Sequence, residues 1–242
     1  MADNLKPSQR LTEDEVMAQI STFLFAGNDT TATGISWVMY ALCKNSSIQD
    51  KLRAEIRAVP NEHPTYEALS SLPYLDAVIR ETLRFQPPIS GTSRIAAKDC
   101  IVPLSTPITR PDGSTLPQLR IAAGTHIFIP IQTTLNDPDV WGPDANEFKP
   151  ERWLSPNGVP DGAMEIPSIK FLPFLAGPRA CIGFRFSITE MKIVIFSLIR
   201  VMSFELAVDP DDIEPKARVV TRPRVKSRPE EGFQLPVLVR AL

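Results

Sequence analysis

One cysteine, Cys181, lies inside a ten-residue run that restricts the local fold more than any other part of the sequence. The run, residues 174–183, reads Phe-Leu-Ala-Gly-Pro-Arg-Ala-Cys-Ile-Gly. Turn-forming residues precede the cysteine, and residues 182–201 have the length and composition of a helix with one apolar face. The pattern therefore predicts that Cys181 lies at a helix N-terminus, where the helix dipole and free N–H groups favour a sulfur anion.

Four neighbours of this cysteine suit a thiolate that binds a metal. Gly177 and Gly183 permit backbone conformations and close approaches that a side chain would block. Arg179 could pair with an anionic group beside the metal, and Phe174 could shield the sulfur from water. A buried thiolate of this kind suits iron.

The run resembles the haem-binding signature Phe-x-x-Gly-x-Arg-x-Cys-x-Gly of the cytochrome P-450 haem-thiolate monooxygenases, and every fixed position matches. The resemblance implies haem b as the cofactor and Cys181 as the axial ligand of its iron, where electron donation by the thiolate favours O–O cleavage. It also implies haem-binding roles for Arg179, Phe174, Gly177 and Gly183. The alternative is a free, buried cysteine that only packs.

A second informative segment lies within a long amphipathic helix, which the sequence predicts over residues 12–44. Thr12, with Glu15 three residues later, has the pattern of a capping box. Inside the helix, residues 26–31 read Ala-Gly-Asn-Asp-Thr-Thr. A glycine in a helix interior costs about 1 kcal/mol relative to alanine, and threonine hydroxyls can bond back to carbonyls and bend a helix. The segment therefore predicts a weakened stretch of the kind that accompanies functional sites.

This segment is similar to the oxygen-activation motif Ala-Gly-x-Asp-Thr-Thr of the same family. The resemblance implies that Thr30 donates hydrogen bonds during oxygen activation and that Asp29 helps to relay protons. A helix-bending cap without a catalytic part is the alternative. A haem-thiolate isomerase or dehydratase would not need the relay, so Thr30 and Asp29 argue against such an enzyme.

A third motif lies on a helix that the sequence predicts over residues 74–85, which two prolines follow. Glu81 and Arg84 share one face of this helix, and that spacing alone predicts an exposed ion pair. In the resembled family, however, Glu-x-x-Arg is a structural motif, and a later run similar to Phe-Lys-Pro-Glu-Arg-Trp completes it through the arginine that is Arg152 here. The resemblance thus implies a buried network of Glu81, Arg84 and Arg152 with an architectural role, behind the proximal side of the haem.

The remaining candidates are less distinctive. Arg94 follows the two prolines at the place where the family has an arginine that contacts a haem propionate, so the resemblance implies that Arg94 and Arg179 are propionate partners. A plain surface arginine is the alternative for Arg94. His126 precedes a predicted strand and His63 lies in a polar loop, so a Cys–His nucleophilic dyad has no positional support.

Composition is compatible with an intracellular globular enzyme. The 242 residues are 43% hydrophobic, and 26 basic against 28 acidic residues give a net charge of −2, which provides no electrostatic reason to expect a nucleic-acid partner. The three cysteines lack disulfide density and zinc-ligand spacing, and we interpret Cys43 and Cys100 as buried free thiols in a reducing compartment. Neither a run of 18 apolar residues nor a signal-peptide pattern is present.

The expected fold is mainly α with small β-sheets, an α+β arrangement that corresponds to the carboxy-terminal half of the P-450 fold. We expect one partial domain over residues 1–242, with strands within residues 100–122 and 203–242. Motifs of the family's amino-terminal half are absent, including its membrane anchor. Membrane association is therefore expected only through that half, as in full-length relatives at the endoplasmic reticulum.

The resemblance implies a monooxygenase, of a eukaryotic and fungal microsomal type, that inserts one atom of dioxygen into a small apolar substrate. Its electrons would come from NADPH through a flavin reductase. The alternative is a truncated fragment that binds haem weakly or not at all and catalyses nothing by itself.

Overall fold

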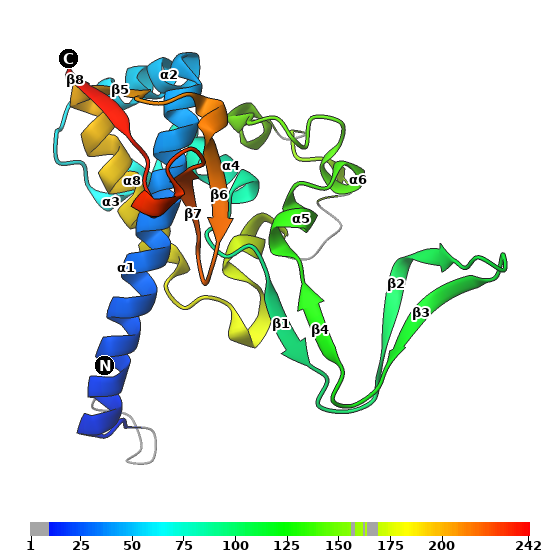
Figure 1. Ribbon diagram of the computed structural model, residues 1–242. Coiled ribbons are helices and arrows are strands. Elements are labelled where there is room, and N and C mark those ends of the chain that lie inside the picture. The colour runs from blue at the N-terminus through cyan, green and yellow to red at the C-terminus, as the bar shows by residue number, and fades with distance from the viewer. Residues whose placement is uncertain (1–9, 156–157, 162, 164–168) are drawn as a thin grey trace. The chain divides into compact units, whose positions relative to one another are not determined.

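The computed structural model of the protein describes residues 10–155, 158–161, 163 and 169–242. These residues form two compact units, one of residues 1–90 with 132–242 and one of residues 91–131. Helices dominate the first unit and antiparallel hairpins the second (Figure 1). The predicted class, mainly α with small β-sheets, is confirmed, whereas one partial domain over residues 1–242 stays a prediction.

The first unit contains most of the helices and two of the two-stranded sheets. Its α-helices are α1 (Glu13–Lys44), α2 (Ser46–Arg57), α3 (Tyr66–Ser70), α4 (Pro73–Phe85), α5 (Ile131–Leu135, which begins at the unit boundary), α6 (Pro138–Trp141) and α8 (Phe184–Val201). Its 3-10 turns are η3 (Pro150–Trp153), η4 (Ile169–Phe174), η5 (Gly177–Arg179), η6 (Pro210–Asp212) and η7 (Pro229–Glu231). Strand β5 (Met202–Leu206) pairs with β8 (Val237–Ala241), and β6 (Ile213–Ala217) pairs with β7 (Thr221–Val225), all antiparallel.

Helix α1 begins as its sequence predicts. The Thr12 hydroxyl accepts a hydrogen bond from the Glu15 backbone N–H at 3.3 Å, and the Glu15 carboxylate accepts one from the Thr12 N–H at 2.8 Å. This reciprocal capping box satisfies two amide groups that a helix end otherwise leaves free. The helix then continues through residues 26–31 without interruption, and the Thr30 hydroxyl donates to the Ala26 carbonyl at 2.8 Å.

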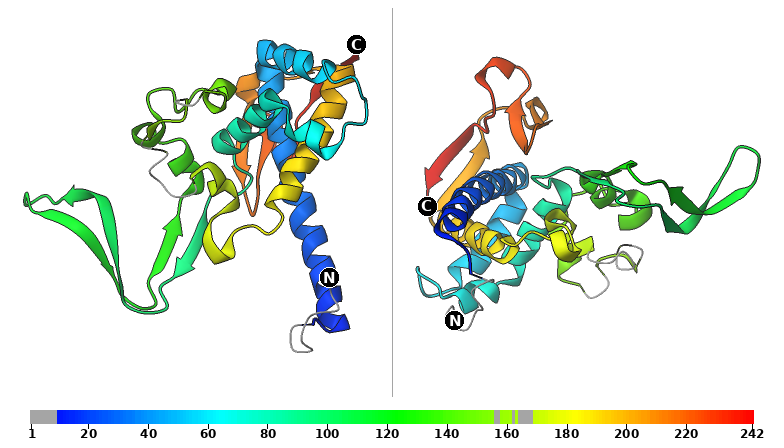
Figure 2. Two further views of the ribbon diagram at one scale, coloured as in Figure 1. Left: turned by 180° about the vertical axis from the view of Figure 1, so that it is seen from behind. Right: turned by 90° about the horizontal axis from the view of Figure 1, so that it is seen from below.

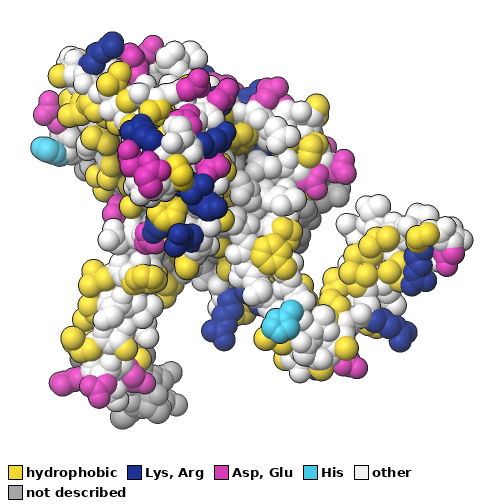
Figure 3. Space-filling view, viewed as in Figure 1, with side chains coloured by type: hydrophobic (Ala, Val, Ile, Leu, Met, Phe, Trp, Pro, Cys, Tyr) yellow, Lys and Arg dark blue, Asp and Glu magenta, His cyan; other side chains and the backbone are white. Residues whose placement is uncertain are grey.

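The two halves of α1 have different surroundings. Its C-terminal half is buried by α2, α4 and α8, whereas its N-terminal half extends beyond these helices (Figures 1 and 2). Apolar side chains remain uncovered along that extension, among them Met17 at 63% and Phe25 at 73% exposure (Figure 3). The core of the first unit therefore lies at one end of α1.

The core forms because apolar side chains recur at helical spacing on the four helices. Fully buried members include Val38, Leu42, Leu52, Ile56, Leu75, Val78, Ile79, Ile195 and Ile199. Helix α1 approaches α8 closely at Gly34, where an added Cβ would lie 3.1 Å from Met191 Cε. A side chain at this position would push the two helices apart or displace Met191.

Sequence analysis did not identify the buried polar junction that attaches α2 to the end of α8. Arg53 is 8% exposed and donates hydrogen bonds to the Ile199 carbonyl at 3.2 Å and to Gln49 Oε1 at 2.7 Å. Gln49 in turn pairs with both backbone groups of Phe204 on β5. The junction satisfies backbone groups at the point where α8 ends and β5 begins.

The second unit consists of two antiparallel pairs. Strand β1 (Thr92–Ile95) pairs with β4 (His126–Ile129), and β2 (Cys100–Thr109) pairs with β3 (Thr115–Ile121). The turn between β2 and β3 contains Gly113 at φ +81°, a conformation that glycine adopts without strain. The strands predicted within residues 100–122 are confirmed.

Among the residues that the structure describes, no helix has both the length and the apolar character needed to cross a bilayer.

Candidate functional site

The loop that carries Cys181 is folded back on itself. The Cys181 N–H donates to the Phe174 carbonyl at 2.8 Å, and the Ala180 N–H donates to the Gly177 carbonyl at 3.0 Å. Gly177 has φ +74°, which favours glycine there. Helix α8 begins at Phe184, two residues later than predicted, with Cys181 three residues before it. The structure thus places the thiol at the N-terminal end of a long helix, as the sequence predicted.

The surroundings of the sulfur differ from the expectation in one respect. Cys181 was expected to be buried beneath Phe174, but it is exposed in the described part of the chain. Phe174 packs instead toward the helical core, with its ring centroid 6.2 Å from that of Phe184. Because the Phe174 ring is packed against the core, it is half-buried while the cysteine stays exposed.

The chemistry of this loop fits an axial ligand of haem iron. An accessible, unbridged thiol just before a helix can reach a metal. Gly183 lies beside it, because an added Cβ there would be 4.0 Å from Cys181 Sγ, in ordinary van der Waals contact with the sulfur. Arg179 is exposed on the same loop and is available to an anionic group.

Thr30 and Cys181 lie on elements that pack against each other. The hydroxyl oxygens of Thr31 on α1 and Ser187 in the first turns of α8 are 3.0 Å apart. Thr30 is therefore adjacent to the crossing of the two helices, and Cys181 precedes the same end of α8. The structure brings the predicted thiol and the predicted threonine to neighbouring parts of one unit.

Asp29 has a partner that sequence reasoning did not identify. Its carboxylate forms an ion pair with the guanidinium of Arg222 on β7, which is 193 residues away in the sequence. Strand β7 is fixed to α1 at this place, because the buried Trp37 indole N–H donates to the Thr221 carbonyl at 2.8 Å. No local sequence pattern connects residues this far apart, so the pair could not be found from the sequence.

Arg94 belongs to the second unit, where it lies on β1. Its guanidinium donates to the Ser93 carbonyl at 2.8 Å and to the Thr92 hydroxyl at 3.2 Å, and the side chain is exposed. Its assignment as a propionate partner stays a prediction.

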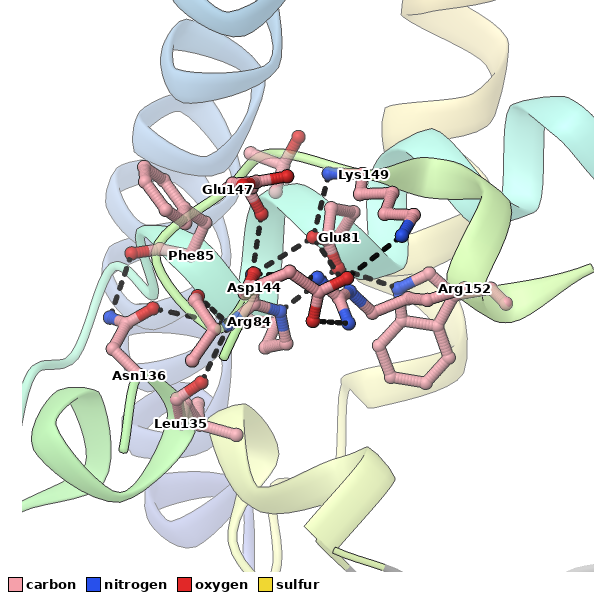
Figure 4. A network of polar contacts seen from close by, with 12 residues as sticks. Glu81, Arg84, Phe85, Leu135, Asn136, Asp144, Glu147, Lys149 and Arg152 are labelled. Atoms are coloured by element: carbon pink, nitrogen blue, oxygen red, sulfur yellow. Dashed lines mark hydrogen bonds and ion pairs between the residues drawn. The ribbon is translucent and has the colours of Figure 1, made fainter. Parts of the chain in front are cut away.

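The structure also brings Glu81, Arg84 and Arg152 together in one buried network (Figure 4). Glu81 is fully buried, and the two arginines are 1% and 3% exposed. Arg84 makes a bidentate pair with Glu81, with both N–O distances 2.9 Å, and Arg152 Nε donates to Glu81 at 3.0 Å. Exposure to water, which the helix spacing alone suggested for Glu81 and Arg84, is therefore excluded.

Further hydrogen bonds connect the two arginines of the network to neighbouring segments. Arg84 donates to the carbonyls of Leu135 and Ala145, each at 2.8 Å, so α4 is attached to the end of α5 and to the turn at Ala145. Arg152 contacts Asp144 at 3.2 Å, and hydrogen bonds from Lys149 and Arg152 hold the pKa of Asp144 below its usual value. Because every charge has a partner, the desolvation cost of burial is offset.

The other cysteines differ from Cys181. Cys43 is half-buried, and burial, aided by the charge of Glu205, raises the pKa of its thiol to about 11. Within the described ranges, no group of three or more His, Cys, Asp or Glu side chains could hold a metal ion.

Comparisons with known proteins agree with the geometry. The family model described as cytochrome P450 matches residues 1–227. The chain is 45% identical over 242 residues to cytochrome P450 monooxygenase 205 of Postia placenta, covering 99% of this chain and 44% of that protein. It is 45% identical over 239 residues to cytochrome P450 monooxygenase 128 of the same fungus, covering 98% and 43%. A third relative, ganoderic acid synthetase CYP5150L8 of Ganoderma lucidum, is 40% identical over 210 residues, covering 84% and 38%.

The chain thus spans less than half the length of these curated relatives.

Proposed function

Because the chain belongs to the cytochrome P450 family, we propose that it carries the proximal thiolate and the proton-delivery residues of a haem-thiolate monooxygenase. The observation that carries the proposal is the accessible Cys181 thiol, held at the N-terminus of α8 by the hydrogen bond from its own N–H to the Phe174 carbonyl. This arrangement leaves the sulfur accessible and able to bind a metal.

The residues of the Cys181 loop would hold haem b. Cys181 would bind the iron, Gly183 would keep space beside the sulfur, and Gly177 would supply the turn that presents the loop. Arg179 and Arg94 would pair with the propionates as charge-assisted hydrogen-bond donors. Phe174 would support the loop from the core side. When bound, the haem would supply the redox-active iron at which dioxygen is activated.

Asp29 and Thr30 would move protons to the reacting centre. The Thr30 hydroxyl donates a hydrogen bond to the Ala26 carbonyl, and the lone pairs of its oxygen can still accept a proton. The adjacent Asp29 carboxylate, 35% exposed, can take protons from water and pass them on. The buried network around Glu81 would support the loop architecture and take no part in proton transfer.

The finer parts of the proposal follow from the family resemblance. Electrons would come from NADPH through a flavin reductase, and the substrate would be small and apolar. Membrane association would involve the amino-terminal half that the longer relatives have, at the endoplasmic reticulum.

The test is the reduced, carbon monoxide difference spectrum of the 242-residue chain after addition of haem, with Cys181→Ala and Cys43→Ala beside it. We expect the Soret band that is characteristic of thiolate ligation in the wild type and in Cys43→Ala, and its loss in Cys181→Ala. Failure of the wild-type chain to take up haem, or an unchanged spectrum in Cys181→Ala, would contradict the proposal and favour a non-catalytic fragment.

A further inference from the structure

Asp29, the proposed proton carrier, is held by a side chain from the opposite end of the chain. Arg222 extends from β7, and its guanidinium forms an ion pair with Asp29. The two side chains are 35% and 29% exposed, so water reaches both. A pair this accessible contributes little to the stability of the fold. Its main physical effect is therefore on the orientation of the Asp29 carboxylate.

The backbone on both sides of Arg222 is fixed, which makes the pairing a defined geometry. The Thr221 carbonyl accepts the Trp37 indole N–H at 2.8 Å, and the Thr221 N–H donates to the Pro88 carbonyl at 2.8 Å. Thr221 and Trp37 are 3% and 1% exposed, so water does not compete for these hydrogen bonds. The Cα of Arg222 is thereby held at a set position along α1.

The guanidinium is also restrained by an aromatic ring. Arg222 Cζ lies 5.0 Å from the centroid of the Phe233 ring, within the range of a cation–π contact. Gln234 next to Phe233 donates its N–H to the Pro223 carbonyl at 3.1 Å, which keeps the ring beside β7. A guanidinium on an aromatic face presents its N–H edge in one plane, and here that edge is directed to Asp29.

A groove lies beside the pair, between α1 and the C-terminal strands. Its volume is about 430 Å³, and its lining includes Asp29, Thr33, Arg222, Phe233 and Leu235. Leu235 and Phe233 are apolar members of the lining, and Asp29 and Arg222 are polar ones. Because Asp29 is 35% exposed, water in this groove can reach the carboxylate oxygens that Arg222 leaves uncovered.

We propose that Arg222 is a positioning residue for Asp29, and that the groove beside the pair is the route by which solvent protons reach this carboxylate. The inference rests on the proposed function for its catalytic meaning. A hydronium in the groove gives one proton to an Asp29 oxygen and becomes water, and Asp29 later releases that proton. One proton passes through Asp29, and the carboxylate returns to its starting state.

The first test uses the haem-free chain. Carbodiimide with an amine nucleophile labels accessible, protonated carboxyl groups, and peptide mass spectrometry follows the rate at Asp29. Because the guanidinium of Arg222 covers one oxygen of the Asp29 carboxylate, Arg222→Gln should raise the labelling rate at Asp29 about threefold or more, and Arg222→Lys should raise it less. Phe233→Leu, which removes the aromatic face, should give an intermediate rate.

The matched control is Arg224→Gln. Arg224 lies on the same strand and pairs with Glu214 in a similarly exposed ion pair, with side chains 22% and 30% exposed. Its replacement should raise labelling at Glu214 and leave the rate at Asp29 unchanged. Equal labelling of Asp29 in the wild type and in Arg222→Gln would overturn the proposal, as would an equal increase in Arg224→Gln.

The second test uses haem-loaded protein and the pH profile of NADPH-driven dioxygen consumption with a flavin reductase. Arg222→Gln should lower the rate about tenfold and change the profile, Arg222→Lys should recover much of the loss, and Arg224→Gln should keep the wild-type profile. The thiolate Soret band should be unchanged in all three variants, because none alters the Cys181 loop. Loss of that band in the wild type would contradict the proposed function, whereas a normal band with an unchanged Arg222→Gln profile would contradict only the role of Arg222.

Discussion

Glu81 and Asp29 are both carboxylates paired with arginine, yet their surroundings are opposite. Glu81 is fully buried and accepts hydrogen bonds from two arginines, from the Trp153 indole and from the Lys149 N–H. Asp29 is 35% exposed and is paired with Arg222 beside an open groove. A carboxylate whose oxygens are fully occupied holds elements in place, whereas one that water can reach is able to exchange protons. The difference suits Glu81 to an architectural role and Asp29 to the proposed transfer of protons.

The largest effect on stability should come from removing the charge of Glu81, the fully buried carboxylate. Glu81→Gln removes the charge that Arg84 and Arg152 share and leaves two buried guanidinium groups without it, which should lower the free energy of unfolding by about 3–5 kcal/mol. Asp29→Asn, the corresponding change at the open site, should lower it by less than about 1 kcal/mol. Urea unfolding followed by circular dichroism measures both values. Similar losses in the two variants would show that the distinction between the sites is wrong.

Asp76 offers an intermediate case. It is 28% exposed and pairs with Lys192 at 2.8 Å and with Arg80. Burial alone would raise the pKa of Asp76, but the hydrogen bonds and charges of Lys192 and Arg80 outweigh it and lower the pKa below its usual value. Asp76→Asn should cost about 1–3 kcal/mol at neutral pH, because Lys192 is 8% exposed and loses its counter-charge.

The same pair predicts a pH dependence. A carboxyl whose pKa is lower in the folded state than in the unfolded chain contributes stability above its unfolded value, about 3.8, and loses it as pH falls through the folded pKa. The stability difference between the wild type and Asp76→Asn should therefore be constant from pH 7 to about pH 5 and shrink below about pH 4. Urea midpoints across this range provide the measurement. A difference that grows on acidification would mean that the ionised form of Asp76 is not the stabilising one.

The smallest effect on stability should come from alkylation of the cysteines, which compares the exposed Cys181 with the half-buried Cys43. Cys181 is exposed, whereas the pKa of Cys43 is raised to about 11, which leaves roughly one molecule in a thousand as thiolate at pH 8. In the haem-free chain, iodoacetamide at pH 8 should modify Cys181 at least about tenfold faster than Cys43, without unfolding the protein. Comparable rates for the two cysteines, measured by peptide mass spectrometry, would contradict the exposure of the Cys181 thiol.

Local patterns predicted the elements well. The capping box at Thr12, the helix over Glu81 and Arg84, and the helix after Cys181 begin within two residues of their predicted positions. These signals are local because caps, prolines and apolar periodicity act over a few residues. Shielding of the sulfur by Phe174 stays a prediction, because the direction of that side chain depends on how its loop packs against the core.

By itself, the sequence determined where the helices lie and which residue types stand at the thiol and acid–threonine motifs, because these are properties of short segments. Only the tertiary structure decided that the Glu81 carboxylate is buried and the Asp29 carboxylate is partly exposed. Arg222 reaches Asp29 across 193 residues, and Arg53 closes the junction of α2 with α8 across 146. Burial and pairing of charges depend on segments that meet only when the core forms, so the surroundings that distinguish Glu81 from Asp29 are properties of the folded chain.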